Sequence, residues 1–484
     1  MLTVLLAAAE AAPFVKTGGL GDVVGSLAKA LRRIGVDARV MLPQYDCIAP
    51  EYKTAMVLKN EAAVPVGWRR QYCGLRELIH DDTPFYFLDN AYYFRRPRVY
   101  GFFDEAERYA FFCRSVLAML PALDVRPQIL HCHDWHAGMI APLLAVHYRG
   151  QSAYQALRTL FTIHNLHYQG IFAKTVLGDV LDLGWEHFTP EGIEFYDQVN
   201  FMKGGLMYAD RISTVSRTYA EEIQTPFLGE MLDGVIRNRR HLLAGIINGI
   251  DYAAYNPATD RHLFVPYDAE EPHKGENKVK LQGMLDLPVN ADTPLLAMVT
   301  RLVGQKGLDL LVRVLEDLLA LDLQLVIVGS GEERYEGFLQ YAGRSHPDKM
   351  SVHIGFDDQL ARRVYAAADL FLMPSLFEPC GTAQLIALRY GCLPVVRETG
   401  GLKDTVMPYD EDADEGNGFT FTNYNAHDML AAIKRALAFY RQPARWSRLV
   451  ARAMRADHSW RSSARQYVGL YNALTAKGDG DGAE

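Results

Sequence analysis

Two glycine-rich segments that carry basic residues could together bind a diphosphate. The first, residues 16–19 (Lys-Thr-Gly-Gly), lies between a strand-like apolar run and a helical pattern. The second, residues 301–307, has the same setting and carries Arg301 and Lys306. Free backbone N–H groups at a helix N-terminus bind phosphate, and fixed cations add to the attraction. We therefore expect the two segments to form two halves of one anion site for a substrate that carries a diphosphate.

Each segment alone is a weak signal, because two glycines before a helix more often form a tight turn than a phosphate site. The first segment lacks the Gly-x-x-x-x-Gly-Lys-Ser/Thr loop of nucleoside triphosphatases and the Gly-x-Gly-x-x-Gly turn of dinucleotide-binding folds. The pairing of the two segments therefore favours a phosphate site and disfavours those two enzyme classes.

The composition predicts a soluble, cytoplasmic enzyme with two domains. At 484 residues and 49% apolar content, the chain is long enough for two cores of roughly 200 residues each. The net charge is −8 without long blocks of like charge, so nucleic acid is not an expected partner. The N-terminus lacks a basic leader with a cleavage region, and no stretch reaches the roughly 20 apolar residues of a membrane span. We therefore expect no membrane partner.

The cysteines and histidines give no strong metal signal. Six cysteines are scattered without a Cys-x-x-Cys pair, which argues against a disulfide framework or a structural zinc site. Residues 131–136 (His-Cys-His-Asp-Trp-His) could bind a metal, but they follow an apolar run as the end of a strand would. A polar edge of an active site is the favoured interpretation of that segment, and we expect no metal.

Strand-like apolar runs alternate with helical stretches in both halves of the chain, which is typical of parallel sheets covered by helices. The runs are 36–42, 85–88, 129–131, 159–163 and 211–215 in the first half, and 295–300, 323–329, 352–354, 370–373 and 393–396 in the second. The predicted fold class is α/β, with two Rossmann-like doubly wound parallel-sheet domains that face a cleft. Ligands of such sheets bind beyond the carboxyl ends of the strands, where both glycine segments lie.

The expected domain boundary lies near residue 246, where a polar, proline-containing stretch interrupts the alternation. We expect a first domain over 1–245 and a second over 246–459. The remainder, 460–484, is predicted to contain a helix that packs back onto the first domain and a disordered tail that is rich in glycine and charge.

Glu378 lies in a proline-containing turn, residues 374–381, between a strand and a helix expected over 382–390. A carboxylate at that position could simply stabilise the helix by interacting with its dipole, which contributes some tenths of a kcal/mol. It could instead bind a sugar hydroxyl while the N–H groups of Gly381, Thr382 and Ala383 bind a phosphate. Beside Arg301 and Lys306, the second interpretation is favoured.

A series of motifs, in order over residues 1 to about 470, resembles those of bacterial glycogen synthase and plant starch synthase. The motifs are Lys-Thr-Gly-Gly-Leu-Gly-Asp (16–22), His-Asp-Trp-His-Ala-Gly (133–138), Thr-Ile-His-Asn-Leu-His-Tyr-Gln-Gly (162–170), Phe-Met-Lys-Gly-Gly (201–205) with Ala-Asp-Arg-Ile-Ser-Thr-Val-Ser (209–216), Ile-Asn-Gly-Ile-Asp (247–251), Thr-Arg-Leu-Val-Gly-Gln-Lys-Gly (300–307), Phe-Glu-Pro-Cys-Gly (377–381) and Thr-Gly-Gly-Leu-Lys-Asp-Thr-Val (399–406).

The resemblance implies the two-Rossmann GT-B glycosyltransferase fold and transfer of glucose from ADP-glucose to the non-reducing end of an α-1,4-glucan such as glycogen. It also implies retention of the α configuration. Two fixed cations and helix N–H groups could stabilise the departing ADP, so no cofactor is expected besides the donor substrate. No carboxylate is securely placed as a covalent nucleophile, so we expect a front-face displacement.

The same resemblance assigns roles to single residues. Glu378 would hold the donor sugar, Arg301 and Lys306 would neutralise the diphosphate, His164 would contact the glucose 6-hydroxyl, and Asp134 would lie on the acceptor side. The donor-binding residues would be Lys16, Gly18, Gly19, Asp22, Asn165, Asn248, Phe356, Gly381 and Thr382. Phe356 stands where the family commonly has a tyrosine that stacks on the base, and Leu376 replaces a usual arginine.

Two other functions stay open from the sequence. One is a related GT-B transferase that uses another sugar nucleotide or a small acceptor, which the motif contexts of Lys16 and Glu378 disfavour. The other is a catalytically silent glucan-binding protein, which would not need the cationic set of Lys16, Arg301 and Lys306. An assay for the release of ADP separates these alternatives from a glucan synthase.

Overall fold

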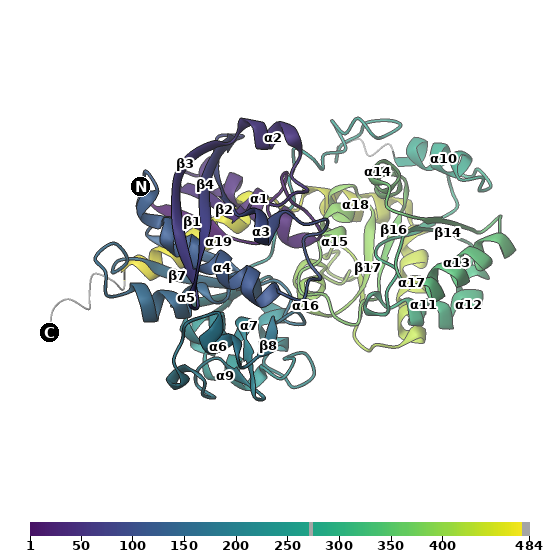
Figure 1. Cartoon of the computed structure of the whole chain (residues 1–484). Helices are drawn as coiled ribbons and strands as arrows, with labels where there is room; N and C mark the ends of the chain where they lie inside the picture. Colours follow the sequence, from purple (N-terminus) through teal and green to yellow (C-terminus); the bar gives the residue numbers. More distant parts are fainter. Residues whose placement is uncertain (271–273, 477–484) are drawn as a thin grey trace. The chain divides into compact units, whose positions relative to one another are not determined.

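The structure is a computed structural model that describes residues 1–270 and 274–476 (Figure 1). These residues form two compact units. The first unit combines Met1–Asn248 with the C-terminal residues from Trp460, and the second is Gly249–Ser459. The tail predicted to be disordered, from Lys477, lies outside the described residues.

The first unit is built on a long mixed sheet. Its strands follow the spatial order β12 (Leu243–Gly245), β11 (Arg211–Thr214), β7 (Arg158–Ile163), β6 (Ile129–His133), β1 (Thr3–Ala7), β2 (Asp37–Pro43), β5 (Thr83–Asp89), β4 (Arg69–His80) and β3 (Val57–Val66). All pairings from β12 to β5 are parallel. Residues 4–7 of the central β1 are fully buried, as expected of a strand that is covered on both faces.

The antiparallel edge of this sheet, β3 and β4, is absent from the predicted strands. The two strands are joined by a two-residue turn in which Gly67 has a φ of 54°, a conformation that favours glycine. Residues 57–61 of β3 are exposed, while Val64 and Val66 are fully buried. Because one face of the hairpin is solvated, its sequence lacks the continuous apolar run that revealed the parallel strands.

Helices and a small sheet complete the first unit. The helices are α1 (Gly19–Arg33), α2 (Pro50–Ala55), α3 (Ala91–Phe94), α4 (Glu105–Met119), α5 (Ile140–Leu143), α6 (Val176–Asp179), α7 (Phe201–Tyr208), α8 (Arg217–Glu222), α9 (Asp233–Asn238) and α19 (Trp460–Ala476). The small antiparallel sheet has the order β8 (Ile171–Ala173), β10 (Gln198–Asn200), β9 (Glu194–Phe195). The C-terminal helix α19 packs against α1, so the two ends of the chain meet within one unit.

The second unit has an entirely parallel sheet, in the order β15 (Met350–Ile354), β14 (Gln324–Gly329), β13 (Leu295–Val299), β16 (Leu370–Met373), β17 (Leu393–Arg397) and β18 (Phe419–Phe421). Its helices are α10 (Lys274–Met284), α11 (Leu308–Arg313), α12 (Leu315–Leu319), α13 (Glu333–Ser345), α14 (Asp358–Ala367), α15 (Ala383–Arg389), α16 (Gly400–Thr405), α17 (Ala426–Tyr440) and α18 (Pro443–Arg455). The strands predicted from apolar runs are confirmed in both units.

Both sheets contain a point at which the strand order reverses. In the first unit the chain moves outward from β1 to β2 and β5 on one side, and to β6, β7 and β11 on the other. In the second unit β13 and β16 hold the corresponding places. Loops that follow the two strands at such a reversal diverge and leave a crevice, which is where open α/β sheets bind ligands. The loops after β1, β6, β13 and β16 are therefore expected to carry the residues of a ligand-binding or active site.

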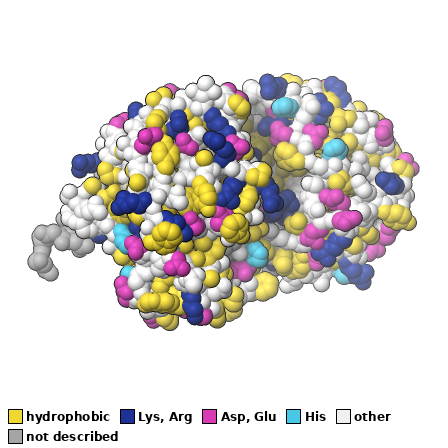
Figure 2. Space-filling model, in the orientation of Figure 1, with side chains coloured by type: hydrophobic (Ala, Val, Ile, Leu, Met, Phe, Trp, Pro, Cys, Tyr) yellow, Lys and Arg dark blue, Asp and Glu magenta, His cyan; other side chains and the backbone are white. Residues whose placement is uncertain are grey.

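The surface carries no large field of a single sign on the face shown in Figure 2, where acidic and basic side chains are interspersed. Among the helices that the structure describes, none is long and apolar enough to cross a membrane. All six cysteines have free thiols, and five of them are buried.

Candidate active site

The loop after β1 is organised around a buried carboxylate, that of Glu10, which is 3% exposed. Its two oxygens accept hydrogen bonds from the backbone N–H of Thr17 at 2.5 Å and from the Thr17 hydroxyl at 2.7 Å. The Tyr100 hydroxyl donates to the same carboxylate at 2.6 Å. Through these hydrogen bonds the buried Glu10 fixes the position of the exposed segment 16–19.

Gly18 and Gly19 stand at the start of α1 with open space around them. A Cβ atom added to either one would meet no atom within 4 Å. By contrast, a Cβ on Gly25 would lie 2.4 Å from the Ala12 carbonyl oxygen, so that glycine is needed for packing. Folding therefore does not demand glycine at 18 and 19, and the bare backbone there leaves room for a ligand to approach the N-terminus of α1.

Lys16 and Asp22 flank these glycines and form an ion pair of 2.8 Å. Both side chains are about half exposed, at 52% and 51%, so the pair contributes little to stability.

Asp134 follows β6 in a left-handed backbone conformation, with a φ of 56°. Its carboxylate accepts a hydrogen bond of 2.8 Å from the backbone N–H of His164, which follows the neighbouring strand β7. Burial raises the pKa of Asp134 to about 7, although hydrogen bonds from the backbone of His164 and Asn165 act in the opposite direction. The negative charge of Glu10 adds a smaller effect that also raises this pKa.

His164 lies against a second histidine in the same crevice. Its Nε2 atom is 3.0 Å from Nδ1 of His133, so one ring donates a hydrogen bond to the other. Burial lowers the pKa of His164 to about 3 and that of His133 well below its usual value. His164 is therefore neutral at physiological pH and acts as a hydrogen-bonding group rather than a cation. Asn165 accepts a hydrogen bond from the backbone N–H of His167, which shapes the loop.

In the second unit, Lys306 and Glu378 meet at the strand-order reversal. The Lys306 ammonium is 2.5 Å from a Glu378 carboxylate oxygen, and their side chains are 14% and 9% exposed. The Ser375 hydroxyl donates to the same oxygen at 3.1 Å. Lys306 belongs to a short 3-10 helix, η6 (Gly304–Lys306), after β13, whereas Glu378 follows β16.

Backbone contacts tie these two loops together. The Leu376 N–H donates to the Gln305 carbonyl at 2.8 Å, and the Gln305 side chain donates to the Phe377 carbonyl at 3.1 Å. Gly307 has a φ of 75°, and a Cβ there would lie 2.1 Å from the Pro374 carbonyl oxygen. Arg301, which precedes these two connected loops in the sequence, is exposed and forms no ion pair with any residue that the structure describes.

The remaining predicted residues take no part in the contacts described above. Gly381, with a φ of 71°, and Thr382 precede α15, whose first N–H groups have no side-chain cap. Phe356 follows β15 and its side chain is 89% exposed. Asn248, the last residue of the first unit's main segment, is 5% exposed, and its side-chain oxygen has no hydrogen-bond partner among the described residues.

The structure thus groups the predicted residues into three local clusters. Lys16 pairs with Asp22, Asp134 joins His164 and Asn165, and Lys306 joins Glu378, with Arg301 five residues before Lys306 in the sequence. The described part of the chain contains no group of three or more metal-ligating side chains. Within segment 131–136, His131 is bound to Tyr471 at 2.8 Å and to Thr162 at 2.6 Å.

Comparisons with known proteins show the family of this chain. A family model described as the starch synthase catalytic domain matches residues 3–238, and one for group 1 glycosyl transferases matches residues 285–450. The glycogen synthase of Geobacillus thermodenitrificans is 54% identical over 477 residues, which cover 98% of each chain. The chain belongs to the glycogen and starch synthase family. The glycogen synthase of Desulforamulus reducens is 53% identical over 479 residues, with 99% of this chain and 100% of that protein covered.

Solved structures establish the fold of this family member. The catalytic domain of starch synthase IV from Arabidopsis thaliana, bound to ADP and acarbose, has a TM-score of 0.89 at 34% identity and covers 98% of this chain and 99% of that one. A sucrose-phosphate synthase from Thermosynechococcus elongatus shares the fold at a TM-score of 0.62 and 19% identity, with 99% and 100% covered. The chain has the GT-B fold of a glycosyltransferase.

Sequence reasoning missed the residues that hold the family motifs in place. His133 contacts His164 and Ser375 contacts Glu378, while Glu10 holds Thr17 and is itself held by Tyr100. His133 was singled out only as part of segment 131–136, and the other three were not candidates. Glu10 gave one usable signal, since it is a lone acidic residue inside the small apolar run 7–12. Tyr100 gave none, because its contact with Glu10 spans 90 residues of sequence.

Proposed function

We propose that this glycosyltransferase moves glucose from ADP-glucose to the non-reducing 4-hydroxyl of an α-1,4-glucan such as glycogen, with retention of the α configuration. The observation that carries the proposal is the Lys306 and Glu378 pair beside Arg301, at the strand-order reversal of the second unit. Its relatives are glycogen synthases, and the related starch synthase IV binds ADP and acarbose.

The charges of the second unit suit a departing nucleoside diphosphate. Arg301 and Lys306 supply two cations, and the uncapped N–H groups at Gly381 and Thr382 supply further donors. Such preorganised groups stabilise charge that develops on a leaving group more strongly than water does. Glu378, which already fixes Lys306, is placed to accept a hydrogen bond from a hydroxyl of the donor glucose. Phe356 offers an exposed ring on which the adenine can stack.

The first unit would supply the other contacts. Lys16, Gly18 and Gly19 would cover the donor phosphate and sugar, with Asp22 releasing Lys16 as the anion binds. Neutral His164 and Asn165 would bind hydroxyls of the transferred glucose. Asp134 lies on the acceptor side, and Asn248 contributes an unpaired side-chain oxygen.

We propose a front-face displacement in which both bonds change on one side of the sugar. The bond between the glucose C1 and the β-phosphate oxygen breaks, and the bond between C1 and the acceptor oxygen forms. The proton of the acceptor hydroxyl passes to the departing phosphate oxygen. Arg301 and Lys306 carry the negative charge that this oxygen develops, so the reaction needs neither a metal ion nor another cofactor. We expect the reaction in the cytoplasm, without a nucleic-acid or membrane partner.

The decisive test compares two donors that share the same sugar. Purified protein is supplied with ADP-glucose or UDP-glucose at equal concentration, with and without glycogen, and the release of each nucleoside diphosphate is followed. We expect fast release of ADP that depends on glycogen and that lengthens the glucan chains. Faster release from UDP-glucose would overturn the donor assignment, release without glycogen would indicate a hydrolase, and no release would reject the transferase.

A further inference from the structure

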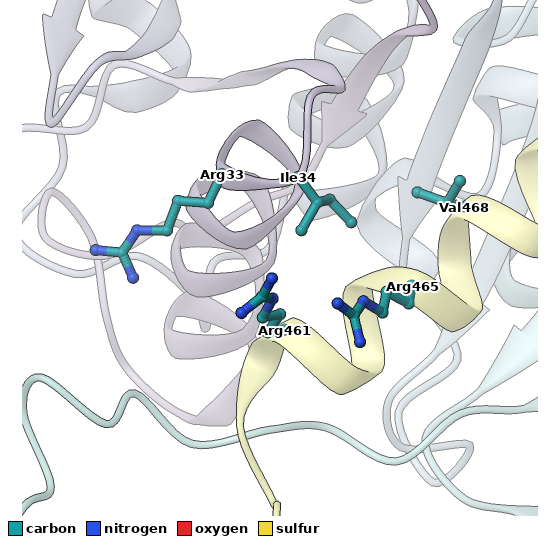
Figure 3. A pocket seen from close by; sticks show the side chains of 5 residues that line it. All are labelled: Arg33, Ile34, Arg461, Arg465 and Val468. Atoms are coloured by element: carbon teal, nitrogen blue, oxygen red, sulfur yellow. The ribbon is translucent and has the colours of Figure 1, made fainter.

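A pocket between α1 and α19 of the first unit carries an arginine cluster that the proposed reaction does not use. It is lined by Arg33, Ile34, Arg461, Arg465 and Val468 and has a volume of about 390 Å³. Figure 3 shows Arg461 and Arg465, from successive turns of α19, extending toward the space beneath Ile34, while Arg33 extends outward at the edge. The volume lies within the range of small-molecule sites.

The arginine side chains of this pocket form no ion pairs within the described residues. Among the residues that the structure describes, the side chains of Arg33, Arg461 and Arg465 form no hydrogen bond or ion pair. Asp81 interacts electrostatically with Arg33, but its carboxylate forms its ion pair with Lys29, at 2.7 Å. Like charges four residues apart on a helix destabilise it by about 0.2–0.5 kcal/mol, so an anion that binds both guanidinium groups would remove a repulsion.

The donor set indicates a phosphate group rather than a carboxylate. Two guanidinium groups present up to ten N–H donors in two planar forks. A phosphate monoester has three strong acceptor oxygens and about −1.5 to −2 charges at neutral pH, which match two forks better than the two oxygens of one carboxylate. Arg461 is also the second residue of α19, where the helix dipole favours an anion.

The apolar side chains that line the pocket could contact the carbon skeleton of a ligand. Ile34 and Val468 line the same pocket, and neither side chain is charged or able to donate a hydrogen bond. They give a carbon skeleton a surface to cover while its phosphate binds the arginines. We propose that this pocket binds a small phosphate monoester with an organic skeleton, at a site separate from the donor site.

The separation follows from α1 itself. This helix of 15 residues begins at Gly19, beside the donor loop, and ends at Arg33, in the pocket. At 1.5 Å per residue its ends are about 22 Å apart, so one small ligand does not reach both.

Calorimetric titration of the full chain in saturating ADP tests this proposal, because ADP occupies the donor site before the probe is added. The probes are a hexose monophosphate and adenosine monophosphate, which distinguish two sources of the same phosphate chemistry, with inorganic phosphate as the reference without a skeleton. We expect at least one ester to bind more tightly than inorganic phosphate. Its affinity should fall by about tenfold or more in the Arg461→Gln/Arg465→Gln variant.

The matched control is the Arg313→Gln/Arg344→Gln variant, which removes two exposed arginines from helices of the second unit and lowers the charge equally. Its affinity for the ester should equal that of the wild type. Equal affinity in the wild type and the Arg461→Gln/Arg465→Gln variant, or no binding of any probe, overturns the proposal. Binding of ADP to each variant, measured in a separate titration without the probe, reports on the donor site.

Discussion

At the scale of single residues, the most consequential contact is the buried ion pair between Lys306 and Glu378. Removal of one partner from such a pair leaves an uncompensated charge in a low-dielectric environment, which is costly. Replacement of Glu378 by glutamine keeps the shape and a hydrogen-bond acceptor, and so separates chemistry from packing.

We predict that Glu378→Gln folds and lowers turnover by about 10²–10³-fold, because one preorganised transition-state contact is worth roughly 3–4 kcal/mol. Arg301→Lys should also be severely impaired, since a point charge does not reproduce the planar fork on a diphosphate. Initial rates of ADP release measure both effects, with Arg344→Lys as the exposed control. Near-native turnover of Glu378→Gln would remove that residue from the site.

Asp134 gives a prediction about pH. Its pKa is raised from 3.8 to about 7, so the folded protein holds the proton more tightly than the unfolded chain does. Ionised Asp134 therefore lowers the free energy of unfolding. This destabilisation is absent below about pH 4, where the carboxyl is protonated in both states, and it is complete above about pH 7. Asp134→Asn should therefore gain stability relative to the wild type as the pH rises through this window, by at most about 4 kcal/mol. Urea unfolding at several pH values measures the difference, and a constant difference from pH 4 to 8 would contradict it.

At the scale of elements, the strand-order reversals decide where chemistry occurs. The buried parallel strands were predictable, since their apolar runs directly reflect burial on both faces. The β3–β4 hairpin was not, because its solvated face interrupts the pattern. The same limit applies to Glu10: its position in sequence was visible, but its function depends on Thr17 and Tyr100, which only the folded chain brings to it.

The glycines around the start of α1 separate folding from binding. Gly18 has an extended backbone, with a φ of −158°, and free space for a Cβ, so Gly18→Ala should fold as well as the wild type. It should nevertheless weaken donor use by about tenfold or more, because a methyl group would displace the ligand. Gly25→Ala should instead lose about 1–3 kcal/mol of stability through its clash with Ala12. Thermal unfolding and the KM for ADP-glucose distinguish the two, and equal donor kinetics in Gly18→Ala and the wild type would contradict the binding role.

The contact between α19 and the first sheet is also testable. The Tyr471 hydroxyl lies 2.8 Å from Nδ1 of the fully buried His131. Tyr471→Phe leaves that nitrogen without its partner, so we expect a loss of about 1–3 kcal/mol in the free energy of unfolding. Tyr341→Phe, at a side chain that is 72% exposed, should change it by less than about 0.5 kcal/mol. Urea denaturation followed by circular dichroism provides both values, and equal values for the two variants would show that the His131 contact is dispensable.

At the scale of the whole molecule, the proposed mechanism uses cationic side chains where a metal-dependent transferase would need carboxylates for its ion. We predict that turnover survives exhaustive chelation, because Arg301 and Lys306 supply the positive charge. Rates of ADP release before and after treatment with EDTA should agree. Loss of activity that magnesium or manganese restores would reject the prediction.

The first unit is formed by two separate segments of the chain, so it cannot be completed until synthesis of the protein is almost finished. Helix α19 completes that unit, yet it emerges from the ribosome after the whole of Gly249–Ser459. At about 5–20 residues per second, the intervening stretch of about 200 residues takes roughly 10–40 s to synthesise. During that interval the surface of α1 that α19 covers stays open to water and to other nascent chains. A chain that terminates early therefore loses part of its first unit, and ribosomal stalling in the second half would leave an aggregation-prone intermediate.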